Sequence, residues 1–153
     1  MKKQFHLTKE GVDEFEKELD DLVSQRGRIA ERIKLAREFG DLTENAEYSS
    51  AREEQVRVES RISELENILQ NVEVIKKPRA NGQVKLGSGV ELTAKGGKKK
   101  SFQIVGSVEA DPLNGKISDE SPIGKSLIGQ KVGDQVEIKT PSETTKYKIV
   151  AIS

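Results

Sequence analysis

The chain has 153 residues, of which 33% are hydrophobic and 34% are charged, and its net charge is zero. With only four Phe and two Tyr, it is too polar for one large globular core and favours a thin helical seam joined to a small second domain. The absence of cysteine excludes disulfide and thiol chemistry. No apolar run follows the first six residues, so we expect no signal peptide, no membrane segment and a cytoplasmic location.

Two stripes of apolar residues follow a heptad spacing and predict an antiparallel helical hairpin. Arg26 interrupts the first stripe and Gln55 interrupts the second. Each helix would be roughly 45 Å long, which is more than a small domain needs, so the hairpin is expected to be an arm that carries its tip to another molecule. The stripes consist of Val12, Phe15, Leu19, Leu22, Ile29, Ile33 and Ala36, then Tyr48, Ala51, Val58, Ile62, Leu65, Leu69 and Val72.

The helix boundaries and domains follow from capping and breaking residues. Thr8 suits the N-cap of the first helix, and Gly40 suits its end because glycine tolerates a left-handed conformation. The second helix is predicted from about Thr43 to Val74, and Pro78 marks a linker. We therefore predict an α+β protein with an arm at residues 1–75, a linker at 76–82 and a C-terminal domain at 83–153.

The period of the apolar residues changes to two after the linker, which predicts a small antiparallel sheet. Strands are expected at residues 83–86, 90–93, 101–105, 135–139 and 145–152. Ser121 before Pro122, with Gly129 after the run, predicts one short helix packed on this sheet. The turn at Lys98–Lys100 is either a solvated turn or a contact to a polymerase or nucleic acid.

Charge is distributed unevenly along the chain. Residues 1–75 hold 12 basic and 18 acidic residues, a balance of −6, and residues 76–153 hold 14 and 8, a balance of +6. The start of the first helix is acidic, whereas the part near the tip is basic. Either these charges are a solvated face, or the basic residues form a collar that holds a phosphate backbone. The collar would comprise Arg26, Arg28, Arg32, Lys34, Arg37, Arg52 and Arg57.

Asp41 and Glu44 lie at the chain reversal and have two interpretations. Asp at an N-cap with Glu three residues later is a capping box, which satisfies backbone N–H groups at the start of a helix. Alternatively, both acids continue the line of the second stripe beyond the partner helix, where two carboxylates would form a weak, open Mg²⁺ site. The two roles are compatible.

Residues 36–48, AREFGDLTENAEY, followed by ARE at 51–53, resemble the tip of the bacterial Gre family of transcript cleavage factors, of the GreA type. Residues 121–129, SPIGKSLIG, resemble a segment of that family's C-terminal domain. The resemblance covers essentially the whole chain. It implies a C-terminal domain similar in fold to FK506-binding proteins, which docks on the rim of the secondary channel of RNA polymerase while the arm enters the channel.

The resemblance also implies roles for individual residues. Asp41 and Glu44 would help the polymerase hold its second Mg²⁺, and Arg37 and Arg52 would contact the 3′ end of the nascent RNA. The factor would stimulate cleavage by the polymerase without being an enzyme itself, would bind no cofactor stably alone, and is expected to be a monomer. The alternatives are a channel-binding factor that inhibits polymerase or competes with other regulators, and a coiled-coil adaptor unrelated to polymerase. The intact acidic pair favours the cleavage factor.

Overall fold

The computed structural model describes residues 4–41, 45–78, 82–139 and 141–153. The chain divides into two compact units. One unit, the arm, holds Val12–Asn71. The other, the sheet unit, holds the segment that ends at Gly11 together with Val72–Ser153. The first turn of the first helix therefore belongs to the sheet unit, although the rest of that helix lies in the arm.

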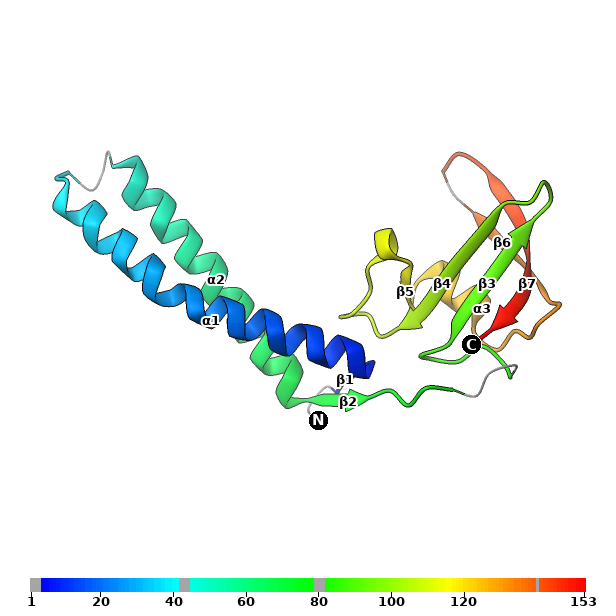
Figure 1. Ribbon diagram of the computed structural model, residues 1–153. Coiled ribbons are helices and arrows are strands. Elements are labelled where there is room, and N and C mark those ends of the chain that lie inside the picture. Colours follow the sequence, from blue (N-terminus) through cyan, green and yellow to red (C-terminus); the bar gives the residue numbers. More distant parts are fainter. Residues whose placement is uncertain (1–3, 42–44, 79–81, 140) are drawn as a thin grey trace. The chain divides into compact units, whose positions relative to one another are not determined.

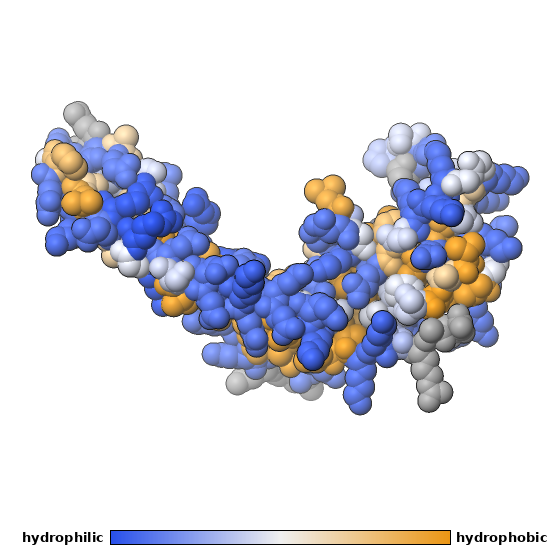
Figure 2. Space-filling model, in the orientation of Figure 1, coloured by the Kyte–Doolittle hydropathy of each residue, from blue (hydrophilic) through white to orange (hydrophobic). Residues whose placement is uncertain are grey.

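The arm is the predicted helical hairpin, built from α1 (Lys9–Glu38) and α2 (Ala46–Gln70) (Figure 1). Its seam buries apolar side chains from both helices, so the heptad prediction is confirmed. Figure 2 shows the remaining surface of the arm as mostly hydrophilic on the face in view. The seam cluster consists of Ile29, Ile33, Ala51, Val58 and Ile62, with Leu19, Leu22 and Tyr48 packed against it.

The predicted end of the second helix is wrong. Helix α2 ends at Gln70, where the N–H of Asn71 donates to the Ile68 carbonyl. Residues Val72–Val74 form strand β2 instead, which pairs in parallel with β1 (Phe5–Leu7). A three-residue strand has no periodicity of its own, and its partner lies almost 70 positions earlier. Pairing with that distant segment overrides the helical pattern.

The sheet unit contains a five-stranded sheet in the order β5-β4-β3-β7-β6 (Figure 1). Its strands are β3 (Gly89–Ala94), β4 (Lys99–Val105), β5 (Lys116–Ser118), β6 (Gln135–Lys139) and β7 (Thr144–Ile152). All neighbours are antiparallel except β4 and β5, which are parallel. A short 3₁₀ helix, η1 (Pro112–Asn114), precedes β5.

The predicted strand at residues 83–86 is absent from the described structure. Val84 is buried, but its backbone pairs only with the loop that follows the short helix, through Gln130 and Gly129. Gly87 then turns the chain with a φ of 95°. Val84 thus satisfies its backbone hydrogen bonds through this loop without forming a strand of the sheet.

The short helix α3 (Pro122–Leu127) begins as predicted. The Ser121 hydroxyl accepts a hydrogen bond from the Gly124 N–H at 3.1 Å, and Pro122 occupies the first turn. Leu127 is fully buried in the core of the sheet unit. The remaining core residues are Val84, Val90, Leu92, Ile104, Ile117, Val136, Ile138, Tyr147, Ile149 and Ile152.

The lysine turn between β3 and β4 makes contacts within the sheet unit. Lys98 Nζ lies 3.9 Å from a carboxylate oxygen of Glu143, and Lys100 Nζ lies 5.6 Å from the centre of the Tyr147 ring. Both contacts are at the surface, where an ion pair contributes little to stability. A contact between this turn and a polymerase or nucleic acid stays a prediction.

Truncating the arm seam should destabilise the arm. Ile62 is only 1% exposed, so Ile62→Ala should lower the free energy of unfolding of the arm by about 2–5 kcal/mol. Val56 is 60% exposed on the same helix, so Val56→Ala should change it by less than about 0.5 kcal/mol. Urea unfolding followed by circular dichroism at the helix band measures both. Equal losses for the two variants would contradict the assigned seam.

Candidate functional site at the end of the arm

Asn45 joins the ends of the two helices at the tip of the arm, which we define as residues 39–45. Its side-chain amide donates to the Ala36 carbonyl at 2.7 Å, and its side-chain oxygen accepts from the Tyr48 N–H at 3.0 Å. The first bond satisfies a carbonyl near the end of α1, and the second caps the start of α2. Gly40, with a φ of 115°, turns the chain after α1 ends at Glu38. The two sides of the tip are therefore held together.

Asn45 lies within the tip motif, but no role was predicted for it from the sequence. Its residue type and its position could have identified it as a cap, because Asn is a preferred N-cap residue directly before a helix. Because Asn45 caps α2, Asp41 is not the N-cap of that helix and lies four residues before the cap. The capping box would pair Asp41 with Glu44, which lies outside the described residues, so that hypothesis stays open.

Of the two predicted metal ligands, the structure describes only Asp41. It is exposed and directly follows Gly40. Glu44 lies outside the described residues, so the predicted convergence of the two carboxylates stays a prediction. Among the residues described, no group of three or more His, Cys, Asp and Glu side chains could hold a metal ion. The exposed Asp41 carboxylate suits a Mg²⁺ ion that takes its other ligands from elsewhere.

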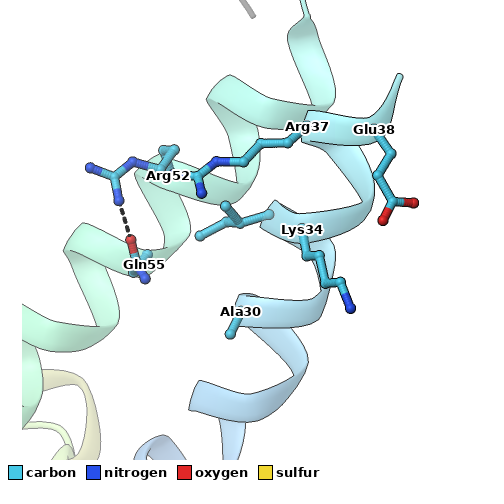
Figure 3. Close-up of a pocket in the computed structure, with 7 residues that line it drawn as sticks. Ala30, Lys34, Arg37, Glu38, Arg52 and Gln55 are labelled. Carbon is cyan, nitrogen blue, oxygen red and sulfur yellow. Dashed lines mark hydrogen bonds between the residues drawn. The ribbon is translucent and has the colours of Figure 1, made fainter. Parts of the chain in front are cut away.

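Arg37 and Arg52 lie on facing helices and line the same hollow below the tip (Figure 3). Figure 3 shows Arg37 extending from α1 toward α2. Its guanidinium carbon lies 5.9 Å from the centre of the Tyr48 ring. Arg52 Nη1 donates to the Gln55 side-chain oxygen at 2.6 Å. The structure therefore brings these two predicted residues together, and Lys34 lines the hollow beside them.

Three further arginines of the predicted collar form ion pairs with glutamates across the hairpin. Arg26 makes a bidentate pair with Glu59, at 2.7 and 2.9 Å. Arg28 pairs with Glu54 at 3.1 Å, and Arg32 bonds both Glu54 and Glu47. These three arginines are therefore engaged within the arm, and a contact of the whole collar with a phosphate backbone stays a prediction. The ion pairs were not predicted because the glutamates on α2 lie far from these arginines in sequence.

These pairs also affect titration. The hydrogen bonds that Arg32 donates to Glu47 raise the pKa of Arg32, and the hydrogen bond that Arg26 donates to Glu59 lowers the pKa of Glu59. Glu59 thus stays ionised to lower pH than an isolated glutamate, and any stability that its pair contributes is lost only as the pH falls through that lowered pKa. At neutral pH these arginines are fixed within the arm.

Three basic residues of the predicted collar line the hollow. Among the residues that the structure describes, none of Lys34, Arg37 and Arg52 forms an ion pair with a carboxylate. Glu38 also lines the hollow, but Figure 3 shows its side chain on the opposite side of α1 from Arg37. Guanidinium groups whose charge is not compensated suit contacts to phosphate oxygens. The site therefore combines an acidic tip with a small basic hollow beneath it.

Comparison with known proteins identifies the family. A model of the transcription elongation factor N-terminal domain matches residues 5–74, and a model of the GreA/GreB C-terminal domain matches residues 79–153. The chain belongs to the GreA/GreB family of transcription elongation factors. Its sequence is 48% identical to transcription elongation factor GreA of Geobacillus kaustophilus, over 98% of this chain and 97% of that protein. The GreA of Thermotoga maritima is 46% identical, over 98% and 97%.

Among solved structures of this family's kind, GreA factor homolog 1 of Thermus thermophilus is 31% identical, covers 99% of both chains and superposes with a TM-score of 0.46. The two family models and the curated relatives confirm the predicted family membership. The order of helices and strands confirms the fold class of a helical hairpin followed by a small sheet domain. No helix in the described part of this family member is long and apolar enough to cross a membrane.

Proposed function

We propose that this chain binds RNA polymerase through the secondary channel and stimulates cleavage of the nascent RNA 3′ end in backtracked complexes. The observation that carries the proposal is the end of the arm, where Asp41 is exposed and where Arg37 and Arg52 line one hollow together. Family membership over nearly the whole chain supports a role in transcription elongation. The protein would act in the cytoplasm as a monomer.

The tip would supply ligands and would not act as a complete active site. Asp41 and Glu44 would offer carboxylate oxygens to the second Mg²⁺ of the polymerase. When bound, that ion would activate the water that attacks the phosphodiester bond. Because Asn45 caps α2, the charge of Asp41 is not needed to begin that helix.

The hollow would hold the RNA. Arg37 and Arg52 would donate hydrogen bonds to phosphate oxygens near the 3′ end of the extruded strand, which fixes the scissile bond near the tip. The sheet unit would dock on the channel rim, with the fold expected from the resemblance to FK506-binding proteins. The division suits the charges, because Arg26, Arg28 and Arg32 are already paired with glutamates within the arm.

The experiment that tests the proposal is a cleavage assay on a stalled, backtracked polymerase complex with labelled RNA. Adding the protein should shorten the RNA from its 3′ end and restore elongation. The alternative, a factor that occupies the channel without cleavage, predicts slower elongation and intact RNA. The adaptor alternative predicts no effect. Either of these two results would contradict the proposal.

We predict that the isolated protein binds Mg²⁺ only weakly and hydrolyses no RNA. Two carboxylates cannot replace the four or more further ligands that a tightly held Mg²⁺ requires. Isothermal titration with Mg²⁺ and incubation with labelled RNA in the absence of polymerase measure both properties. RNA hydrolysis that copurifies with the protein and is lost in Asp41→Asn would contradict the division of labour between factor and polymerase.

A further inference from the structure

Seven lysines gather at one end of the five-stranded sheet. Residues 95–100 and 139–148 hold these seven lysines and a single acidic residue, Glu143. The two segments are neighbours, because Thr93 near the end of β3 pairs with Lys148 in β7. Four of the eight acidic residues after position 75 lie instead between residues 109 and 120, near the edge strand β5. Charge is therefore segregated within the sheet unit.

Four of the seven lysines lie on the face of the sheet that is turned away from the core. Successive side chains of a strand point to opposite faces, and Tyr147 and Ile149 of β7 are buried in the core, so the lysines at 146 and 148 lie on the other face. Thr93 pairs with both Lys148 and Lys99, which places Lys99 on that face too. We call the four residues the lysine face, and all of them are exposed: Lys99, Lys139, Lys146 and Lys148.

The charges of the lysine face are not compensated by close ion pairs. Lys98, in the neighbouring turn, lies 3.9 Å from Glu143, but among the residues that the structure describes no lysine of the face forms an ion pair. Two carboxylates share this side of the sheet, namely Glu91 and, opposite Lys146, Glu137. Four cations and two anions leave the face with a positive charge.

The spacing of these lysines suits the phosphate groups of a duplex. Lys99 and Lys148 lie on the two strands that flank β3, so their backbones are about 10 Å apart, and Lys146 lies about 7 Å from Lys148 along β7. A DNA duplex carries about one phosphate per 1.7 Å of its axis, so several phosphates can be contacted at once. Single strands are bound by stacking their bases on aromatic rings, and the described residues of this face include none.

We propose that the lysine face binds the phosphate backbone of double-stranded nucleic acid without regard to its sequence. The inference goes beyond the proposed function and does not depend on it, since all four lysines belong to the sheet unit. Each phosphate contact releases counterions and contributes about −0.9 to the slope of log affinity against log salt, so four contacts predict a slope of about −3.6.

Two triple variants with the same loss of charge test the lysine face. The face variant carries Lys99→Gln, Lys146→Gln and Lys148→Gln. The control variant carries Lys76→Gln, Lys77→Gln and Lys125→Gln, which are exposed lysines of the same unit outside the face. Exposed substitutions of this kind change stability little, and circular dichroism checks that both variants are folded.

The measurement is the fluorescence anisotropy of a short labelled DNA duplex, titrated with full-length protein at several salt concentrations. The parent protein and both triple variants carry Arg37→Ala and Arg52→Ala, so that the hollow in the arm contributes nothing. At low salt the face variant should bind at least about tenfold more weakly than the parent, and its slope should fall to about −0.9. Each single substitution on the face should reduce the slope by about 0.9, and the control variant should stay within about twofold of the parent.

Several results would overturn the assignment. Equal losses in the face and control variants would show that only the total charge of the unit matters. No binding by the parent protein, or a slope that the face substitutions leave unchanged, would exclude the lysine face as the site. Unlabelled single-stranded DNA or polyglutamate that displaces the duplex as well as unlabelled duplex does would show that the face accepts any polyanion, an acidic protein surface included. Loss of RNA cleavage alone would contradict the proposed function and leave this result unaffected.

Discussion

Asp41→Asn and Glu44→Gln should each reduce stimulated RNA cleavage by about a hundredfold or more, because removing a metal ligand costs several kcal/mol of transition-state stabilisation. Both substitutions keep the size of the side chain and a hydrogen-bonding oxygen. Neither residue caps α2, since Asn45 does. Thermal stability and affinity for polymerase should therefore remain close to those of the wild type. Single-turnover cleavage on a backtracked complex measures the rate.

Asn45→Ala is the matched control for these tip variants. It should lower the stability of the arm by about 1–2 kcal/mol, because it removes the cap of α2 and the bond to the Ala36 carbonyl. At a temperature where the arm stays folded, it should retain far more cleavage than Asp41→Asn. If Asp41→Asn instead destabilised the arm as much as Asn45→Ala and left cleavage intact, the metal-ligand role would be wrong.

Removing Arg37 and Arg52 together should weaken RNA engagement strongly. Each arginine lost from a phosphate contact should cost about tenfold, since hydrogen bonds to charged groups contribute about 1.5–3 kcal/mol. The double variant should therefore cleave about 100-fold more slowly at low RNA occupancy, and its rate should fall less steeply with salt. The Mg²⁺ dependence should not change, because the tip carboxylates are intact.

The control for this prediction removes the same number of charges elsewhere in the arm. Arg26 and Arg28 are already paired with Glu59 and Glu54, so their double substitution by alanine should leave cleavage within about twofold of the wild type. Comparable losses in both double variants would show that only the total charge of the arm matters. The hollow would then have no specific role.

The arm could be predicted from the sequence because a seam such as Ile29, Ile33, Val58 and Ile62 repeats within each helix. The ion pairs of the arm could not be predicted, because Arg32 contacts Glu47 and Glu54 only after the hairpin folds. For the same reason, the pairing of β1 with β2 was missed. Periodicity describes one element at a time, whereas these contacts join two elements.

The candidate site could also be predicted only in part from the sequence. Residue types around the tip indicated an acidic pair and two arginines, and the structure brings Arg37 and Arg52 into one hollow. The cap at Asn45 was missed because Asp41 and Glu44 fit the same capping pattern a few residues earlier. The contact of Thr8 with Glu109 has no sequence signal at all, since it depends on how β1 and the β4–η1 loop pack together.

If the tip completes a metal site, the protein should change the Mg²⁺ dependence of RNA cleavage. The cleavage rate of backtracked polymerase should be measured across a Mg²⁺ titration without protein, with wild type and with Asp41→Asn. The wild type should lower the Mg²⁺ concentration at half-maximal rate, and Asp41→Asn should not, although high Mg²⁺ should partly restore its rate by mass action. Acceleration by the wild type with an unchanged Mg²⁺ requirement, or an equal shift with Asp41→Asn, would contradict the claim.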